Sequence, residues 1–309
     1  MAEAVMSGVR APAARRSSLR AIARRKPMIA FMMALPLILL ILLLVVYPAL
    51  YSIHLATLNR SMKRFVGFGN FLFLFKRDTF WMVVKQSVIF ACTAVFFKTL
   101  IGIFLANFVH TIPTKGQRKW RGMLMVSWVI PTAISSITWF WLFDPSYSAF
   151  NWLLAKFFGT APIPWLGEPL WARFCVILVN IWAGTPFFMI MYLAALKSVP
   201  EQLYEAAAID GANWWQRLWY VTLPMMRNII SITVLFSLIV TFANFDIVRI
   251  LTNGGPVDQT QIFATWAFQV GIQGNDIPLG ASVSLFMFPI LGVSAYFILR
   301  GVRRRSQEI

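Results

Sequence analysis

Charged residues are scarce in this chain: they make up 13% of its 309 residues, against about a quarter in a soluble globular domain. Hydrophobic residues make up 59%, and a soluble fold cannot hide that much apolar surface in one core. They also come in blocks, each close to the roughly 20 residues that a helix needs to cross a bilayer. The composition therefore excludes an ordinary soluble domain and indicates an integral membrane protein.

Cysteine and histidine are equally rare, with two of each. Cys92 and Cys175 both lie inside apolar segments, so we expect small buried residues and neither a disulfide nor a metal pair. His54 and His110 have no Cys, Asp or Glu neighbour at ligand spacing, which argues against a metal site. The sequence shows no nucleophile–base combination and no Ser-centred elbow motif, so it offers no support for a membrane enzyme.

The net charge of +17 comes largely from the two ends of the chain. Both basic runs adjoin apolar segments, as the positive-inside rule expects of cytoplasmic flanks, so we do not interpret them as a nucleic-acid surface. The basic residues of these runs are Arg10, Arg15, Arg16, Arg20, Arg24, Arg25 and Lys26 at the start, and Arg300, Arg303, Arg304 and Arg305 at the end.

Six apolar runs qualify as spanning helices. The first is longer than a typical signal-peptide core and no small-residue cleavage site follows it, so we expect a retained helix. The predicted spans are Met28–Ile53, Gln86–Val109, Gly122–Phe143, Ala172–Leu196, Ile229–Leu251 and Leu279–Leu299.

An even number of spans places both termini on one side of the membrane. With the termini in the cytoplasm, the inner segments hold 18 Lys and Arg and the outer segments hold eight, so charge favours this orientation. The first outer segment contradicts the rule locally, with six basic residues between Arg60 and Lys85. In the second outer segment, the aromatic-rich stretch 147–158 predicts a short helix on the membrane surface.

The longest late polar interruption, Ser198–Pro224, predicts two short helices with a sharp turn between them. We expect Ser198 and Glu201 to form a capping box for the first helix, and Gly211 to end it in the left-handed conformation. Pro224 is expected to mark the point at which the chain turns back toward the membrane. A well-formed re-entry loop with ordinary helix stops is the alternative interpretation.

The spacing within this loop resembles a known motif. Glu205-Ala206-Ala207, then Gly211, then Val221-Thr-Leu-Pro224 is similar to the "EAA" loop of binding-protein-dependent ABC importers, with Val221 where that family prefers Ile. Phe65-Val-Gly-Phe-Gly-Asn-Phe71 with Phe80-Trp81, and Leu251-Thr-Asn-Gly-Gly-Pro256, resemble segments of the sugar (maltose-type) permease branch. The resemblance covers nearly the whole chain from Met28 onward.

The resemblance implies an all-α, six-helix type I importer permease in a bacterial inner membrane. It implies a first helix with its external segment (28–85) and a permease core (86–300) containing the coupling loop (197–227). The basic runs outside the resemblance predict two cytoplasmic tails, 1–27 and 301–309. The resemblance implies four kinds of partner: a second permease subunit, an ATPase dimer, an extracytoplasmic solute-binding protein and the lipid bilayer. The chain has no G-x-x-x-x-G-K-[ST] phosphate loop, so ATP and Mg²⁺ are expected on the partner ATPase and no cofactor in this chain.

The resemblance also assigns site residues. Those expected to dock on the ATPase are Glu205, Ala206, Ala207, Asp210 and Gly211. Those expected to line the substrate path are Asn180, Gly184, Phe187, Ser237, Thr241 and Phe245, with Gly184-Thr185-Pro186 expected to break or kink its helix. Small and hydroxyl residues are also common in helix–helix contacts, so packing alone is the alternative at each position.

Besides Arg173 at the very start of the fourth span, three charges lie inside the predicted spans. Asp246 and Arg249 are three residues apart, so one helix face can hold them as an ion pair. Lys98, near the middle of the second span, is left with three interpretations: it snorkels, it faces a partner chain, or the predicted boundary is displaced.

The competing function is a secondary carrier or channel that works without an ATPase. Such carriers usually place carboxylates or broken helices near the middle of the membrane. Here Asp144, Asp246, Asp258 and Asp276 fall toward the predicted outer side, which argues against proton coupling and leaves sodium coupling open.

Overall fold

A computed structural model describes residues 26–146 and 148–306, with only the backbone of 26–27 and 302–306. The predicted basic tails therefore lie largely outside the described residues, as does Tyr147 of the predicted surface helix. The described chain is α-helical, and its only β feature is an isolated bridge between Leu58 and Phe65. This confirms the predicted all-α class.

The chain divides into two units, residues 1–51 and 52–309, and each is described by itself. The first contains helix α2 (Lys26–Ile41), a π-helical turn (Leu42–Val46) and the start of α3 (Tyr47–Ala56). The continuous candidate span Met28–Ala56 has a mean hydropathy of 3.2, and none of its most apolar window is buried. A helix whose most apolar part is uncovered is suited to lipid or to the surface of another chain.

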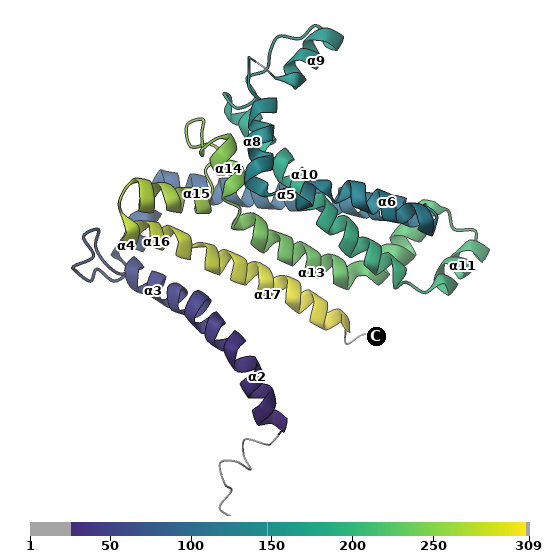
Figure 1. Ribbon diagram of the computed structural model, residues 1–309, viewed down its shortest axis with the longest axis horizontal. Helices are drawn as coiled ribbons and strands as arrows, with labels where there is room; N and C mark the ends of the chain where they lie inside the picture. Colours follow the sequence, from purple (N-terminus) through teal and green to yellow (C-terminus); the bar gives the residue numbers. More distant parts are fainter. Residues whose placement is uncertain (1–25, 147, 307–309) are drawn as a thin grey trace, which may run out of the picture. The chain divides into compact units, whose positions relative to one another are not determined.

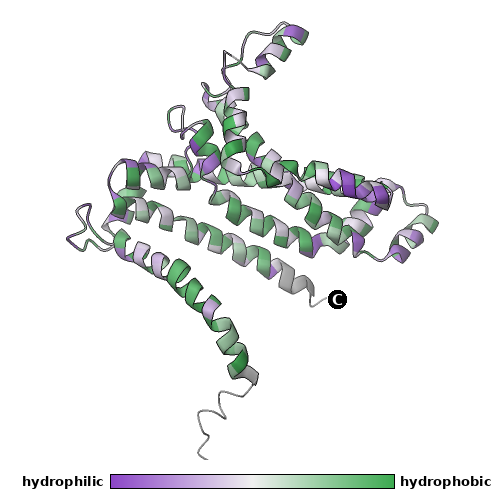
Figure 2. Cartoon of the chain, viewed as in Figure 1, coloured by the Kyte–Doolittle hydropathy of each residue, from purple (hydrophilic) through white to green (hydrophobic). Residues whose placement is uncertain are grey.

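The second unit is built on four long helical segments, and each is long and apolar enough to cross a membrane. They are α5 (Asp78–Thr111), α10 (Pro169–Lys197), the continuous helical stretch from α12 (Trp214–Arg217) through the π-helical turn Leu218–Thr222 to α13 (Leu223–Phe242), and the pair α16 (Ile277–Leu285) and α17 (Met287–Ser306). Helices α5 and α10 pack along each other, and α13 contacts α5, α10 and α17 (Figure 1). Figure 2 shows that hydrophobic residues dominate these long helices, while hydrophilic residues gather at α6 (Thr114–Leu124).

Shorter helices connect the long ones. They are α4 (Gly69–Phe75), α6 (Thr114–Leu124), α7 (Val126–Val129), α8 (Thr132–Leu142), α9 (Ala149–Phe158), α11 (Glu201–Ile209), α14 (Asp246–Leu251) and α15 (Phe263–Phe268), the last followed by a π-helical turn, Gln269–Gln273. Helix α9 falls in the segment predicted to form a short helix; Ser148 caps it and Gly159 ends it with φ +62°.

The predicted third span, Gly122–Phe143, is not one helix. Helix α6 ends at Leu124, and Ile130 then takes an extended conformation (φ −69°, ψ 130°) before Pro131. The proline ring disfavours helical backbone in the residue before it, and proline has no N–H to donate. The predicted span is therefore made of the end of α6, then α7 and α8. The described residues contain five unbroken candidate spans where six were predicted.

The fifth predicted span is also displaced. Its helix begins at Trp214, before the predicted start at Ile229, and α13 ends at Phe242, so residues 243–245 separate it from α14. The predicted turn after Leu251 is confirmed, because α14 ends at that residue.

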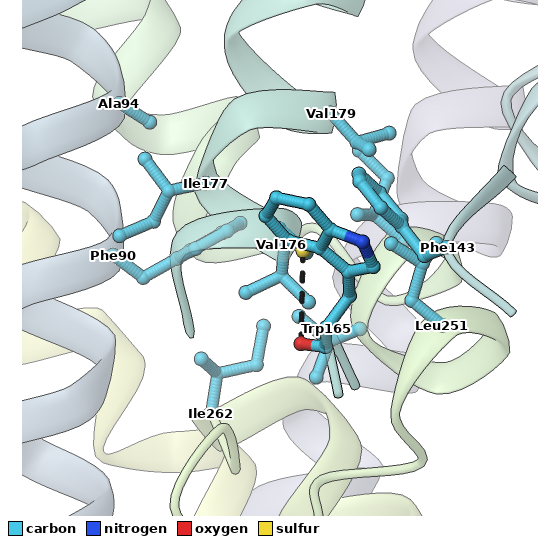
Figure 3. Close-up of a cluster of buried hydrophobic side chains, with 12 residues drawn as sticks. Phe90, Ala94, Phe143, Trp165, Val176, Ile177, Val179, Leu251 and Ile262 are labelled. Atoms are coloured by element: carbon cyan, nitrogen blue, oxygen red, sulfur yellow. Dashed lines mark hydrogen bonds between the residues drawn. The ribbon is translucent and has the colours of Figure 1, made fainter. Parts of the chain in front are cut away.

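Three hydrophobic clusters form the core of the second unit. One joins α5, α8, α10 and α14 around Phe143, Trp165 and Val176 (Figure 3). Cys175 is fully buried there and its Sγ donates to the Trp165 carbonyl at 3.7 Å, whereas Cys92 is exposed on α5. The expectation of small buried cysteines is therefore right for Cys175 and wrong for Cys92, and both are free thiols.

A second cluster joins the C-terminal halves of α5 and α10 to the first part of α13, around Phe188, Tyr192 and Met226. The third joins α4, α5, α15 and α16 around Phe80 and Phe263. Two of the three clusters thus lie between α5 and α10, which makes this pair the frame on which the other helices are placed.

Candidate functional site

The loop between α10 and α13 folds as a helix, a tight turn and a second helix. Gly211 has φ +74°; its N–H donates to the Ala208 carbonyl at 3.1 Å, and the Ala212 N–H donates to the Ala207 carbonyl at 2.9 Å. These two bonds form a Schellman motif, in which a left-handed residue satisfies the last carbonyls of a helix. The predicted helix end at Gly211 is confirmed.

The predicted cap at the other end of α11 is wrong. The Ser198 hydroxyl donates to the Ala195 carbonyl at 2.7 Å, and α11 begins after Pro200 without a side-chain cap. The capping box lies one helix later: Asn213 Oδ1 accepts the Gln216 N–H at 2.9 Å, and Gln216 Oε1 accepts the Asn213 N–H at 2.7 Å. Serine hydroxyls can bond to a backbone carbonyl three or four residues earlier in the chain. Ser198 makes such a bond to Ala195, and its hydroxyl therefore does not cap α11.

Pro224 does not turn the chain. The helix runs on from Trp214 to Phe242, with a π-helical turn at Leu218–Thr222 directly before the proline. A proline inside a helix removes one hydrogen bond and presses on the carbonyl four residues back. A π-helical turn widens the backbone at that point and accommodates both effects. The change of direction lies at Gly211.

The loop presents α11 on the surface of the unit. Glu205, Ala206, Asp210 and Gly211 are exposed and Ala207 is half-buried, so the residues predicted for coupling share one accessible region.

The loop is fastened behind this surface. The Tyr204 hydroxyl and the Thr222 hydroxyl are 3.0 Å apart, and Arg217 Nε donates to the Ala212 carbonyl at 2.9 Å. Between these contacts and the end of α5 lies a cavity of ≈ 500 Å³, lined among others by His110, Tyr204 and Arg217. Helix α11 is thus exposed on one side and tied to the long helices on the other.

A buried polar cluster lies deep between the long helices. The Lys98 side chain is 4% exposed, and its Nζ donates to the Thr241 hydroxyl at 3.1 Å. Lys98 also fills the space beside Gly184, where an added Cβ would lie 2.7 Å from Lys98 Cε. Two residues predicted for the substrate path, Gly184 and Thr241, therefore meet around one lysine. Because Lys98 is buried inside this chain, it neither snorkels nor faces a partner chain. The predicted boundary is displaced, since α5 begins at Asp78 and not at Gln86.

Two further predicted residues lie one helical turn away. Asn180 precedes Gly184 by four residues and Ser237 precedes Thr241 by four, so each is on the same helix face as its neighbour. Both are buried, at 4% and 5% exposure. The Asn180 Oδ1 has no hydrogen-bond partner within the described part of the chain.

The two predicted aromatic residues belong to different surroundings. Phe187 is half-buried, and its ring lies 6.3 Å from the ring of Trp128 and 5.3 Å from that of Phe236. Phe245 lies in the break after α13 and its ring is 5.1 Å from Phe268.

Helix α10 runs without a break through Gly184-Thr185-Pro186, so the predicted helix break is wrong. The Thr185 hydroxyl donates to the Ile181 carbonyl at 2.7 Å, and Gly184 and Phe188 lie against Lys98 and Gly102 of α5. Because Gly184 has no side chain, the Lys98 side chain can pack against α10 at this point.

The predicted Asp246–Arg249 pair does not form. Arg249 donates to Asn253 Oδ1, and its guanidinium lies 5.0 Å from the centre of the Phe268 ring. The single salt bridge between described residues joins Arg60 and Asp276 at 4.0 Å. Asp246 is exposed at the start of α14, where a carboxylate interacts favourably with the helix N-terminus.

One buried polar residue near this region was not singled out from the sequence. Asn244 follows Thr241 by one turn, and its Oδ1 is buried without a hydrogen-bond partner among the described residues. An asparagine in an apolar run is a weak signal by itself, and only the packing shows that its carbonyl oxygen is enclosed.

No group of three or more His, Cys, Asp or Glu side chains that could hold a metal occurs among the described residues.

Residues 98–307 match the family of the binding-protein-dependent transport system inner membrane component. The trehalose/maltose transport system permease protein MalF of Thermococcus litoralis is 31% identical over 287 residues, which are 91% of this chain and 96% of that protein. The galactooligosaccharides transport system permease protein GanP of Bacillus subtilis is 29% identical over 82% of this chain and 65% of its own length. The chain spans about half (49%) of MalF of Klebsiella aerogenes.

The fold is that of a solved importer. A chain of the bacterial alginate ABC transporter, in complex with an alginate pentasaccharide-bound periplasmic protein, superposes with a TM-score of 0.80 at 24% identity. The match covers 93% of this chain and 98% of that one. The architecture predicted from the sequence, an importer permease, is confirmed.

Proposed function

This chain belongs to the family of inner membrane components of binding-protein-dependent transport systems, and on that premise we propose that it is a permease subunit of an ATP-driven sugar importer. Support for the sugar class comes from relatives named for trehalose, maltose and galactooligosaccharides, which match over most of this chain. The five unbroken apolar spans found between residues 28 and 301 support a multi-pass protein of the inner membrane. Both termini are assigned to the cytoplasm from the distribution of Lys and Arg alone.

The observation that carries the proposal is the exposed helix α11, held by its turn between two long membrane helices. Glu205, Ala206, Ala207, Asp210 and Gly211 form the surface that docks on a separate ATPase subunit. The small alanine side chains allow a close approach, and Glu205 is free to accept hydrogen bonds from the partner. ATP and Mg²⁺ bind to that partner, and this chain has no cofactor and no catalytic role of its own.

The substrate path runs past Asn180, Gly184, Phe187, Ser237 and Thr241. Hydroxyl and amide groups bind sugar hydroxyls, and an aromatic ring packs against the apolar face of a sugar. Phe245 is assigned to the same path at its outer end. A second permease subunit completes the path, and an extracytoplasmic solute-binding protein delivers the substrate to it.

The first experiment is to purify the tagged chain from its native membrane in mild detergent and identify what accompanies it. We expect a stoichiometric ATPase and a second permease. A chain that is recovered alone, in a detergent that preserves a known importer complex, contradicts the proposal and favours the secondary carrier or channel.

A matched pair of variants tests the docking surface. Ala206 and Ala208 are both exposed on α11 and are two residues apart, so they point to opposite sides of the helix. We expect Ala206→Glu to reduce recovery of the ATPase at least tenfold and Ala208→Glu to reduce it much less. Equal recovery with both variants would place the contact elsewhere.

A further inference from the structure

Lys98 lies far inside the membrane-spanning part of α5. It stands thirteen residues before the end of the helix at Thr111, which at about 1.5 Å per residue is roughly 20 Å. Its side chain is 4% exposed, and residues of this chain alone bury it. Lys98 therefore belongs to the interior of this subunit and does not face lipid or the outer surface.

No carboxylate accompanies this lysine. Within the described residues the single salt bridge joins Arg60 and Asp276, and Lys98 has one hydrogen bond, to the neutral Thr241 hydroxyl. An ammonium group has three N–H donors, so two are left without such a partner. Ionisable residues inside a membrane are costly and ordinarily pair with one another or mark the path of a charged substrate.

A purely structural role does not explain why a lysine occupies this position. A methionine of similar length fills the same space without a charge to desolvate. The neighbouring helix is also adapted to the lysine, because any side chain at residue 184 would put its Cβ 3.0 Å from Lys98 Nζ. A glycine on α10 thus makes room for a cation on α5.

The groups around the lysine are neutral hydrogen-bonding groups. Thr241 is in direct contact with Lys98, and Ser237 lies one turn before Thr241 on α13. Asn180, one turn before Gly184, has a buried carbonyl oxygen without a partner. Neutral donors and acceptors around one cation suit a ligand that has many hydroxyls and one negative charge.

We propose that Lys98 binds an acidic group of the transported carbohydrate, a carboxylate or a phosphate, and that this importer takes acidic sugars. The inference rests on the proposed function. When α13 separates from α5 and α10 during transport, the acidic group replaces the Thr241 hydroxyl as the acceptor for Lys98 Nζ. The charged pair then forms in a site that excludes water, where such hydrogen bonds are strong.

The test uses the complete importer with its solute-binding protein in proteoliposomes. Uptake is measured for three labelled probes: a neutral maltotriose, an oligogalacturonate and a sugar phosphate. For the wild-type importer we expect uptake of at least one of the two acidic probes, well above that of the neutral one. The acidic probe that is taken up tells whether the group is a carboxylate or a phosphate.

Two variants then assign the selectivity to the lysine. Lys98→Met keeps the length of the side chain and removes its charge, so we expect uptake of the acidic probe to fall at least tenfold. Lys98→Arg keeps the charge and is expected to retain part of the uptake. Lys85→Met, an exposed lysine on the same helix, is the matched control and should behave like the wild type.

Wild-type uptake of maltotriose alone overturns the inference and leaves the sugar importer intact, and this result does not depend on the folding of any variant. Equal uptake of the acidic probe by Lys98→Met and Lys85→Met also overturns it. Failure of the proposed function is a separate result, namely a chain that purifies without an ATPase.

Discussion

Substitution of Gly211 tests the coupling loop through the backbone alone. Gly211 has φ +74°, and a Cβ added there meets no atom within 4 Å, so a larger side chain has room. The cost of a substitution is then the cost of the left-handed conformation, about 1–2 kcal/mol for an ordinary L-residue. That corresponds to a roughly 5- to 30-fold loss in the ratio of correctly to incorrectly formed turns, and a β-branched residue loses more.

We expect Gly211→Val to abolish uptake by the reconstituted importer, and Gly211→Asn to retain part of it, because asparagine tolerates the left-handed conformation. Membrane insertion of the chain should be unchanged, since residue 211 is exposed and a side chain there packs against nothing. Gly122→Val is the matched control: Gly122 is helical and also has nothing within 4 Å. Normal uptake by Gly211→Val, or equal uptake by the Val and Asn variants, would refute the requirement for this turn.

Three further predictions concern stability and the substrate path. Gly280→Ala should lower the stability of the purified chain by about 1–3 kcal/mol, because its Cβ would lie 2.5 Å from the Cα atom of Gly271. Gly292→Ala should leave the stability unchanged, because nothing lies within 4 Å of the added Cβ. Equal melting temperatures of the two variants would contradict the packing argument. Asn151→Ala removes three hydrogen bonds, one of them from Trp165 Nε1 at 2.9 Å, so limited proteolysis of residues 159–168 should be several-fold faster, and an unchanged rate would show that the segment is held by other contacts. Ser237→Leu should weaken the stimulation of ATP hydrolysis by substrate without changing basal hydrolysis, and a normal response would put the path elsewhere.

Features with local causes could be predicted from the sequence. The turn at Gly211 follows from a residue type that tolerates positive φ directly after a helix-forming stretch. The end of α14 at Leu251 follows from the turn residues that come next. Long apolar runs predicted the four long helices of the second unit, because length and composition alone decide whether a helix can cross a bilayer.

Features for which the sequence offers two similar candidates, such as two possible helix caps or two prolines, were predicted less well. Ser198 and Asn213 are both good helix caps, and the sequence does not say that Ser198 has the Ala195 carbonyl within reach. Pro131 lies inside the predicted span Gly122–Phe143, and Pro224 lies five residues before the predicted span Ile229–Leu251. The first interrupts its span and the second is absorbed by a π-helical turn, and the difference lies in the backbone that precedes each one.

The environment of Lys98 could not be predicted, because its contacts join residues 86 and 143 positions apart in the chain. The sequence shows a lysine in an apolar run and, separately, a glycine and a threonine that resemble substrate-path positions. Only the packing of α5, α10 and α13 shows that these three residues meet.

The coupling loop and the Lys98 cluster are joined through the same two helices. Gly184 lies on α10 thirteen residues before its end, roughly 20 Å along the axis, and Thr241 lies near the end of the helical stretch that begins at Trp214. Helix α11 lies in the covalent connection between those two helices. A displacement of α11 must therefore move α10 and α13 or be absorbed in the turn at Gly211, and the contacts of Tyr204 and Arg217 oppose the second outcome. A shift of α13 against α5 of about an ångström is enough to break a 3.1 Å hydrogen bond between Lys98 and Thr241, since such bonds are lost beyond about 3.5 Å.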